Sequence, residues 1–232
     1  MSIAIIPARS GSQRIKKKNI KLFNGKPAIY WSILEAKKTK IFNKIIVSTD
    51  DKKIANLAIR YGALVPFIRS KKMSENNVST VDVIKDTLLK LNIPMEDLVC
   101  CIYPVAPLMS YKDIIKSYKI LKKNKKLDFI FPAATYSSNI HRAFYYLNNN
   151  QNKVKPVNKS FFYGKEIKKK NYKEKDTYHD SGQFYWGKCD KWIKKKDIFK
   201  SRARIIKIPR WRSQDINTEE DWTTAEKLFK IT

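Results

Sequence analysis

The amino-acid sequence predicts an α/β protein built on a mainly parallel sheet with helices on both faces. Two observations support this fold class. Short apolar runs alternate along the chain with stretches in which apolar residues recur at helical spacing. The runs are continuous, which is typical of strands buried on both faces. The predicted strands are residues 3–7, 44–48, 63–68, 98–103 and 128–133.

The helices between these strands have recognisable starts and ends. Pro27 is expected to open the first helix, because proline suits the first helical position. Asp50 and Asp51 are expected to cap the second helix, which Gly62 ends. The predicted helices are residues 27–38, 50–61, 79–91, 110–123 and 218–230.

Two of these helices begin with the pattern of a capping box, in which two side chains satisfy each other's backbone N–H groups. Ser110 with Asp113 has this pattern before the fourth helix, and Thr218 with Asp221 has it before the last. Both helices are therefore expected to start at these positions.

The segment from about residue 136 to 178 differs from the rest, being rich in Asn, Lys and Tyr. We predict one domain over residues 1–232 with this segment inserted as a β-rich arm, extended at 142–147 and 160–163. Such an arm usually packs against a partner, and we expect that partner to be a second copy of the chain. The alternative is that the segment is a loosely ordered insertion. The strands expected after the arm are 182–186, which alternates, and 203–208.

The chain is strongly basic, with 49 Lys and Arg against 21 Asp and Glu and a net charge of +28. The lysines occur along the whole chain, which is typical of solvated helix faces. We therefore expect no specific nucleic-acid partner, and a faster encounter with anionic substrates. A basic nucleic-acid-binding domain is the alternative from a different class.

Cysteine usage and hydropathy predict a cytoplasmic protein. Cys100 and Cys101 are adjacent in a predicted strand and point to opposite faces, and Cys189 is isolated. These thiols lack metal-ligand spacing and favour a reducing compartment. No apolar run reaches the roughly 18 residues that cross a bilayer. The apolar start is shorter than a signal peptide, so no membrane association is expected.

The loop after the first strand gives the strongest functional signal. Guanidinium and ammonium groups neutralise phosphate oxygens, and Gly11 would let the backbone approach a ligand. The loop has neither of the common glycine-rich phosphate patterns. It still predicts a phosphate site at the carboxyl edge of the sheet, with a solvated basic turn as the alternative. Its polar members are Arg9, Ser12, Arg14, Lys18 and Asn19.

The segment Ile-Ile-Pro-Ala-Arg-Ser-Gly-Ser at 5–12, followed by Lys18-Asn19, resembles the nucleotide loop of the acylneuraminate cytidylyltransferases. Further blocks match in the same order, so the resemblance covers essentially the whole chain. It implies a Rossmann-like nucleotidyltransferase sheet flanked by helices, with a β-rich dimerisation arm. The segments 103–108, 140–145 and 178–185 resemble the branch that activates pseudaminic acid. The remaining matching blocks are 47–50, Arg69 with 73–80, and 215–221.

The resemblance implies that CMP passes from CTP to the anomeric hydroxyl of a nine-carbon keto-sugar acid, releasing pyrophosphate. The product would serve surface glycan or flagellin glycosylation. Pseudaminic acid is the favoured substrate, and sialic or legionaminic acid is the alternative. The resemblance also implies Mg²⁺ as cofactor and a homodimer. A non-catalytic nucleotide-sugar binder is a further alternative.

The resemblance also implies roles for individual residues. It gives Arg9, Lys18 and Asn19 the catalytic contacts. A His beside an Asp is more often a hydrogen-bonded structural pair than an acid–base pair, and for His179 and Asp180 the place of their segment favours sugar binding. The nucleotide is expected against Ala8, Arg9, Ser10, Gly11, Ser12, Lys18, Asn19, Arg69 and Thr80. The sugar is expected against Tyr103, His141, Arg142, His179, Asp180 and Gln183.

Asp215 and Asn217 are the candidate metal ligands. Side chains two residues apart on an extended segment point to the same side, so together they could hold Mg²⁺. The family pattern has Asp at both positions, and Asn217 removes one negative charge. Glu219 and Asp221 are nearby carboxylates that could compensate. A plain turn carboxylate is the alternative for Asp215.

Overall fold

The computed structural model describes residues 1–138, 140–147, 153–158, 177–194 and 197–231. The chain divides into two compact units. The first consists of Met1–Ala133 with Asp180–Thr232, and the second of Ala134–His179. No helix in the described ranges is long and apolar enough to cross a membrane.

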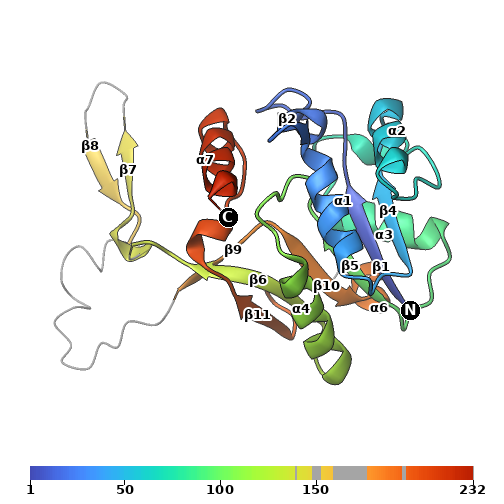
Figure 1. Ribbon diagram of the computed structural model, residues 1–232. Coiled ribbons are helices and arrows are strands. Elements are labelled where there is room, and N and C mark those ends of the chain that lie inside the picture. Colours follow the sequence, from blue (N-terminus) through green and yellow to red (C-terminus); the bar gives the residue numbers. More distant parts are fainter. Residues whose placement is uncertain (139, 148–152, 159–176, 195–196, 232) are drawn as a thin grey trace. The chain divides into compact units, whose positions relative to one another are not determined.

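The first unit is built on a mixed, mainly parallel sheet, as the sequence predicts (Figure 1). Its strands lie in the order β11-β6-β10-β5-β1-β4. Strand β1 pairs parallel to both β4 and β5, and β11 pairs parallel to β6. Strand β10 is antiparallel to both of its neighbours. The strands are β1 Ser2–Pro7, β4 Lys44–Ser48, β5 Leu98–Ile102, β6 Phe129–Thr135, β10 Phe184–Lys188 and β11 Ala203–Lys207.

Helices cover both faces of this sheet. Helix α1 packs against α4, and α3 packs against α6; in Figure 1 the first pair lies on the near face and the second on the far face. A small hairpin, β2 Leu22–Phe23 with β3 Lys26–Pro27, precedes α1. The helices are α1 Ala28–Lys38, α2 Lys52–Arg60, α3 Thr80–Lys90, α4 Tyr111–Lys123, α6 Cys189–Ile193 and α7 Glu219–Lys230. Short 3-10 turns are η1 Lys18–Ile20, η2 Lys72–Ser74 and η4 Arg210–Arg212.

Two strand predictions are wrong in detail. Residues 63–68 form only isolated bridges, Ile46 to Leu64 and Thr49 to Ile68. Pro66 lies between these bridges and has no N–H to continue a ladder. The strand expected to alternate at 182–186 is β10, and its residues from Phe184 to Gly187 are all buried. It lies between β5 and β6 inside the sheet and is therefore covered on both faces.

The helix caps follow the predictions with two exceptions. The predicted capping box of Thr218 and Asp221 is present at α7. Asp51 caps α2 alone, because its carboxylate accepts from the N–H of Lys53 at 2.6 Å and of Ile54 at 3.1 Å. The prediction that Asp50 also caps α2 is wrong, since its carboxylate turns to the loop after β1.

The second exception is α4. Ser110 caps this helix by accepting from the N–H of Lys112. Asp113, expected to complete a capping box, pairs instead with the guanidinium of Arg212. This ion pair ties α4 to the turn η4, which precedes the candidate metal ligands.

The second unit contains a hairpin of β7 Phe144–Leu147 and antiparallel β8 Lys153–Pro156. It also contains the turn η3 Ile140–Arg142 and the strand β9 Tyr178–Asp180, which ends in the first unit. Large apolar side chains on the hairpin are exposed, Phe144 at 58%, Tyr146 at 60% and Val154 at 62%. The extended piece predicted at 160–163 lies outside the described residues.

Candidate active site

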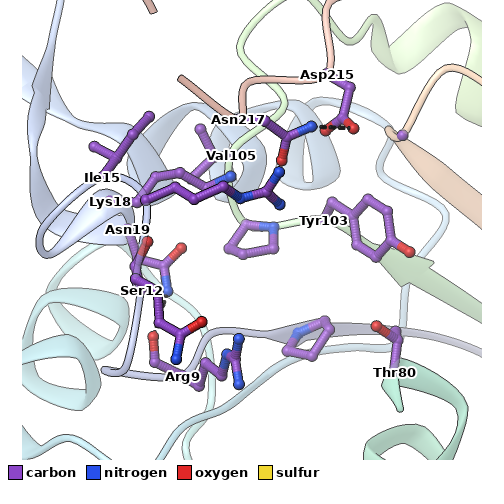
Figure 2. A pocket seen from close by; sticks show the side chains of 15 residues that line it. Arg9, Ser12, Ile15, Lys18, Asn19, Thr80, Tyr103, Val105, Asp215 and Asn217 are labelled. Carbon is purple, nitrogen blue, oxygen red and sulfur yellow. Dashed lines mark hydrogen bonds between the residues drawn. The ribbon is translucent and has the colours of Figure 1, made fainter. Parts of the chain in front are cut away.

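A cavity of about 330 Å³ opens at the carboxyl edge of the sheet, where β1 ends (Figure 2). The loop after β1 forms one wall, and the segment between η4 and α7 forms another. In Figure 2, Asp215 and Asn217 lie on one side of the cavity and Arg9 and Thr80 on the other. The predicted residues that line it are Arg9, Ser12, Arg14, Lys18, Asn19, Thr80, Tyr103, Asp215 and Asn217. Gln13, Pro104, Val105 and Gly182 also line it and were not among the predicted site residues.

The loop after β1 is held in one shape by buried anchors. Asn19 is 7% exposed, and its side-chain amide donates to the carbonyl of Arg9 at 2.8 Å, closing the loop. Ile15 is 1% exposed and packs in an apolar cluster with Phe23 and Trp222. Asn19, predicted to act on the phosphates, therefore has a clear role in positioning Arg9.

The same apolar cluster joins the loop to the opposite wall. Ile216, between the two candidate metal ligands, is buried in the cluster together with Ile15. Trp31 packs against its edge. Burial of these side chains on both walls fixes the width of the cavity, because a well-packed apolar contact resists separation.

Lys18 spans the cavity between these walls. Its ammonium donates to the carbonyl of Ile216. Burial lowers the pKa of Lys18, and the nearby Asp215 carboxylate opposes that effect. A phosphate placed beside Lys18 would favour its charged form in the same way as Asp215 does.

Asp215 and Asn217 point to the same side, as expected for residues two apart on an extended segment. The amide of Asn217 donates to Oδ2 of Asp215 at 2.6 Å. Gly182 has φ +62°, a backbone conformation that favours glycine, and a Cβ there would lie within van der Waals contact distance of the Asp215 side chain.

The two carboxylates that could compensate for Asn217 have other partners. Asp221 accepts from the N–H groups of Asn217 and Thr218, and Glu219 pairs with Lys21. Burial would raise the pKa of Asp221, but these hydrogen bonds hold it below its usual value. Among the described residues, no three His, Cys, Asp or Glu side chains form a metal cluster. A cation here would be held by Asp215 and the amide oxygen of Asn217, with phosphate oxygens and water as its remaining ligands.

Tyr103 lines the side of the cavity opposite the loop. Burial raises the pKa of its phenol well above the usual value, so the group stays protonated and can donate a hydrogen bond. Asp180 accepts from the N–H of Gly182 at 2.8 Å and from the hydroxyl of Tyr185. Gln183 is 2% exposed and donates to the carbonyl of Arg212. These contacts support the wall behind Tyr103.

Arg69 does not line this cavity but a smaller one of about 180 Å³. Thr80, Arg9 and Pro7 line both cavities, so the two are neighbours. The guanidinium of Arg69 donates to the Ser74 hydroxyl at 3.0 Å. Burial lowers the pKa of Arg69, and Asp50 opposes this effect.

The remaining predicted residues lie elsewhere. Ala8 is fully buried beside β4, and Ser10 is bonded to Asp50. Gly11 is surrounded by open space, so the folded chain alone does not require a glycine there. His141, Arg142 and His179 belong to the second unit. There His141 bonds Asn158, and the ring of His179 lies 5.0 Å from that of Tyr136.

A mainly parallel sheet with a cationic cavity at its carboxyl edge is typical of Rossmann-like nucleotide-binding proteins. A model of the cytidylyltransferase family matches residues 3–229. The chain belongs to this family and is a CTP-dependent nucleotidyltransferase.

Known proteins resemble the chain over nearly its whole length. It is 37% identical to a protein of Campylobacter jejuni named pseudaminic acid cytidylyltransferase, over 99% of this chain and 97% of the relative. It is 29% identical to a CMP-N,N'-diacetyllegionaminic acid synthase of Legionella pneumophila, over 99% and 96%. A solved CMP:2-keto-3-deoxy-manno-octonic acid synthetase complexed with CTP matches with a TM-score of 0.69 and 14% identity, over 99% and 98% of the two chains. This last likeness concerns the fold.

Proposed function

We propose that the enzyme transfers CMP from CTP to the anomeric hydroxyl of pseudaminic acid and releases pyrophosphate. The observation that carries the choice of sugar is the 37% identity, over nearly the full length, to a relative named for this reaction. Over the same share of the chain, identity to the Legionella pneumophila relative named for legionaminic acid is lower, at 29%. The segments 103–108 and 178–185 support the same choice.

The cavity suggests where each part of CTP would bind. We place the triphosphate against Arg9, Ser12 and Lys18, which line the larger cavity. We place the cytidine toward the smaller cavity of Arg69 and Thr80. A buried guanidinium and a hydroxyl can hydrogen-bond the polar edge of a pyrimidine ring. The sugar would then approach from the side of Tyr103.

In the reaction, the anomeric oxygen attacks the α-phosphorus, and its hydroxyl proton passes to water. The bond from the α-phosphorus to the bridging oxygen breaks, and pyrophosphate leaves. Such a displacement depends on alignment and on neutralising negative charge. Lys18 and Arg9 would supply that neutralisation, and the protonated phenol of Tyr103 would orient the acidic sugar.

We propose Mg²⁺ as the cofactor that accompanies CTP. Mg²⁺ is commonly held by one or two carboxylates together with substrate phosphates and water. Asp215 and Asn217 fit this description. The amide nitrogen of Asn217 donates to Asp215, which leaves the amide oxygen of Asn217 available to a cation. When bound, the ion would neutralise the triphosphate beside Lys18.

Replacing Asn217 by Asp tests this assignment. The variant gains a second carboxylate at the proposed metal site, so we expect half-maximal activity at a Mg²⁺ concentration several-fold lower than in the wild type. A titration of initial rate against Mg²⁺ measures this. Gln214→Glu adds the same charge outside the cavity lining and should leave the titration unchanged. Equal titrations for Asn217→Asp and the wild type would count against this site.

We also propose that the enzyme is a cytoplasmic homodimer. The exposed apolar side chains of the β7–β8 hairpin support burial against a second copy of the chain. His141, Arg142 and His179, in the same unit, remain proposed sugar contacts. The three cysteines are unpaired and buried, in keeping with a reducing compartment.

A substrate panel tests the proposed function. Purified protein with CTP and Mg²⁺ is incubated with pseudaminic, legionaminic or sialic acid, and pyrophosphate release is measured. We expect release with pseudaminic acid, at a kcat/KM at least about tenfold above the others, the discrimination that a few pocket contacts supply. Release chiefly with another acid would reassign the sugar. CTP binding without any release would favour a non-catalytic nucleotide binder.

A further inference from the structure

The carboxylate of Asp50 makes two hydrogen bonds to a single residue of the phosphate loop. Oδ1 accepts from the backbone N–H of Ser10 at 2.8 Å, and Oδ2 accepts from the Ser10 hydroxyl at 2.7 Å. Strands β1 and β4 pair side by side, with Pro7 opposite Ser48, so the segments that follow them meet at the sheet edge. Asp50 therefore fixes the peptide immediately after Arg9.

The same carboxylate faces Arg69. The Arg69 side chain is 2% exposed, and its Nη2 lies 3.9 Å from Oδ1 of Asp50. The backbone also joins these residues, since the N–H of Arg69 donates to the carbonyl of Thr49 at 2.7 Å. One acidic group thus lies between the loop that presents Arg9 and the buried cation of the smaller cavity.

A third segment completes the arrangement. Arg9 donates to Oδ1 of Asn76 at 2.8 Å and to the carbonyl of Glu75 at 3.4 Å. Arg69 donates to the hydroxyl of Ser74. These acceptors are neutral, so they orient both guanidinium groups without cancelling their charge. Asp50 is the carboxylate to which the loop is anchored.

We propose that Asp50 is a positioning residue for CTP, acting through Ser10 on Arg9 and directly on the orientation of Arg69. The proposal rests on the CTP site proposed above. It also changes the expectation for Ser10, whose hydroxyl is bound to Asp50 and would act on the nucleotide through loop shape. Asp51, the next residue, caps α2 and supplies a matched control.

The test compares CTP binding by calorimetry in the wild type, Asp50→Ala, Ser10→Ala, the double variant and Asp51→Ala. Asp50→Ala should weaken CTP binding by about tenfold or more, because a charge-assisted anchor of the loop is lost. In steady-state assays its KM for CTP should rise while its KM for the sugar acid stays unchanged. Asp51→Ala should lower the melting temperature, by loss of the cap, and leave CTP affinity unchanged.

The double variant separates two roles for Ser10. If the hydroxyl acts only through Asp50, adding Ser10→Ala to Asp50→Ala causes no further loss of affinity. Independent, additive losses would mean that Ser10 contacts CTP itself and would overturn this part of the proposal. If Asp50→Ala binds CTP as tightly as Asp51→Ala does, the proposal that Asp50 positions CTP is overturned. If Asp50→Ala does not fold, Ser10→Ala alone must still weaken binding. A wild type that does not bind CTP would instead refute the proposed function.

Discussion

Replacing Lys18 by Met should lower kcat by about 10²- to 10³-fold, the usual cost of removing one group that stabilises charge in the transition state. Met keeps the length and the apolar stem of the side chain and removes the ammonium. The thermal midpoint should change little, because replacing a partly buried cation with an apolar side chain is often neutral for stability. Steady-state kinetics and thermal unfolding of the same preparation measure both quantities.

The pH dependence gives a second readout for Lys18. Because its pKa is lowered by burial, Lys18 loses its proton in the free enzyme at a pH below that of an exposed lysine. The kcat/KM of the wild type should therefore fall on the alkaline side as this proton is lost, and Lys18→Met should lack that limb. Lys16→Met removes the same charge from an exposed position of the same loop and should behave like the wild type. A Lys18→Met enzyme with kcat within about threefold of the wild type would contradict the assigned role, since a group that stabilises the transition state is worth far more.

Replacing Gly187 by Ala should cost about 3 kcal/mol of unfolding free energy, at the upper end of overpacking effects. A Cβ at this position would lie 2.5 Å from Cε1 of Phe129 and 2.8 Å from Nε1 of Trp192. Gly187 lies in β10 inside the sheet, and both aromatic side chains are fully buried, so neither has room to move. Chemical denaturation of the variant measures the loss.

Gly25→Ala is the matched control for this effect. Gly25 has φ +77°, and a Cβ added to it would meet nothing within 4 Å, so the substitution changes backbone strain alone. It should cost about 1 kcal/mol. A Gly187→Ala variant no less stable than Gly25→Ala would mean that β10 is not packed between Phe129 and Trp192.

The parts of the fold that follow from local pattern were predictable. Strands β1, β4 and β5 are continuous apolar runs, and the capping box of Thr218 and Asp221 is a local pattern, so both follow from neighbouring residues. The position of β10 was not predictable, because its antiparallel insertion between β5 and β6 depends on pairing with residues far away in the sequence, such as Trp186 with Cys100 and with Ile130.

The candidate site also has a part that was predictable from local sequence and a part that was not. The loop from Arg9 to Asn19 was predictable, since its cations follow a buried strand directly. The neighbouring carboxylates Asp50 and Asp51 were not distinguishable from sequence, although one anchors the loop and the other caps a helix. Their roles depend on how the chain turns beyond the paired ends of β1 and β4, where the Asp50 side chain faces Ser10 and the Asp51 side chain faces the first N–H groups of α2.

The most direct test of the active-site assignment is a crystal structure of the enzyme with CTP and Mg²⁺ and without the sugar, so that no turnover occurs. We predict that the triphosphate lies in the larger cavity against Arg9 and Lys18, with the metal ion on the side of Asp215. The cytosine should lie toward Arg69 and Thr80. Density for CTP at any other part of the sheet edge, with this cavity holding only water, would contradict the assignment.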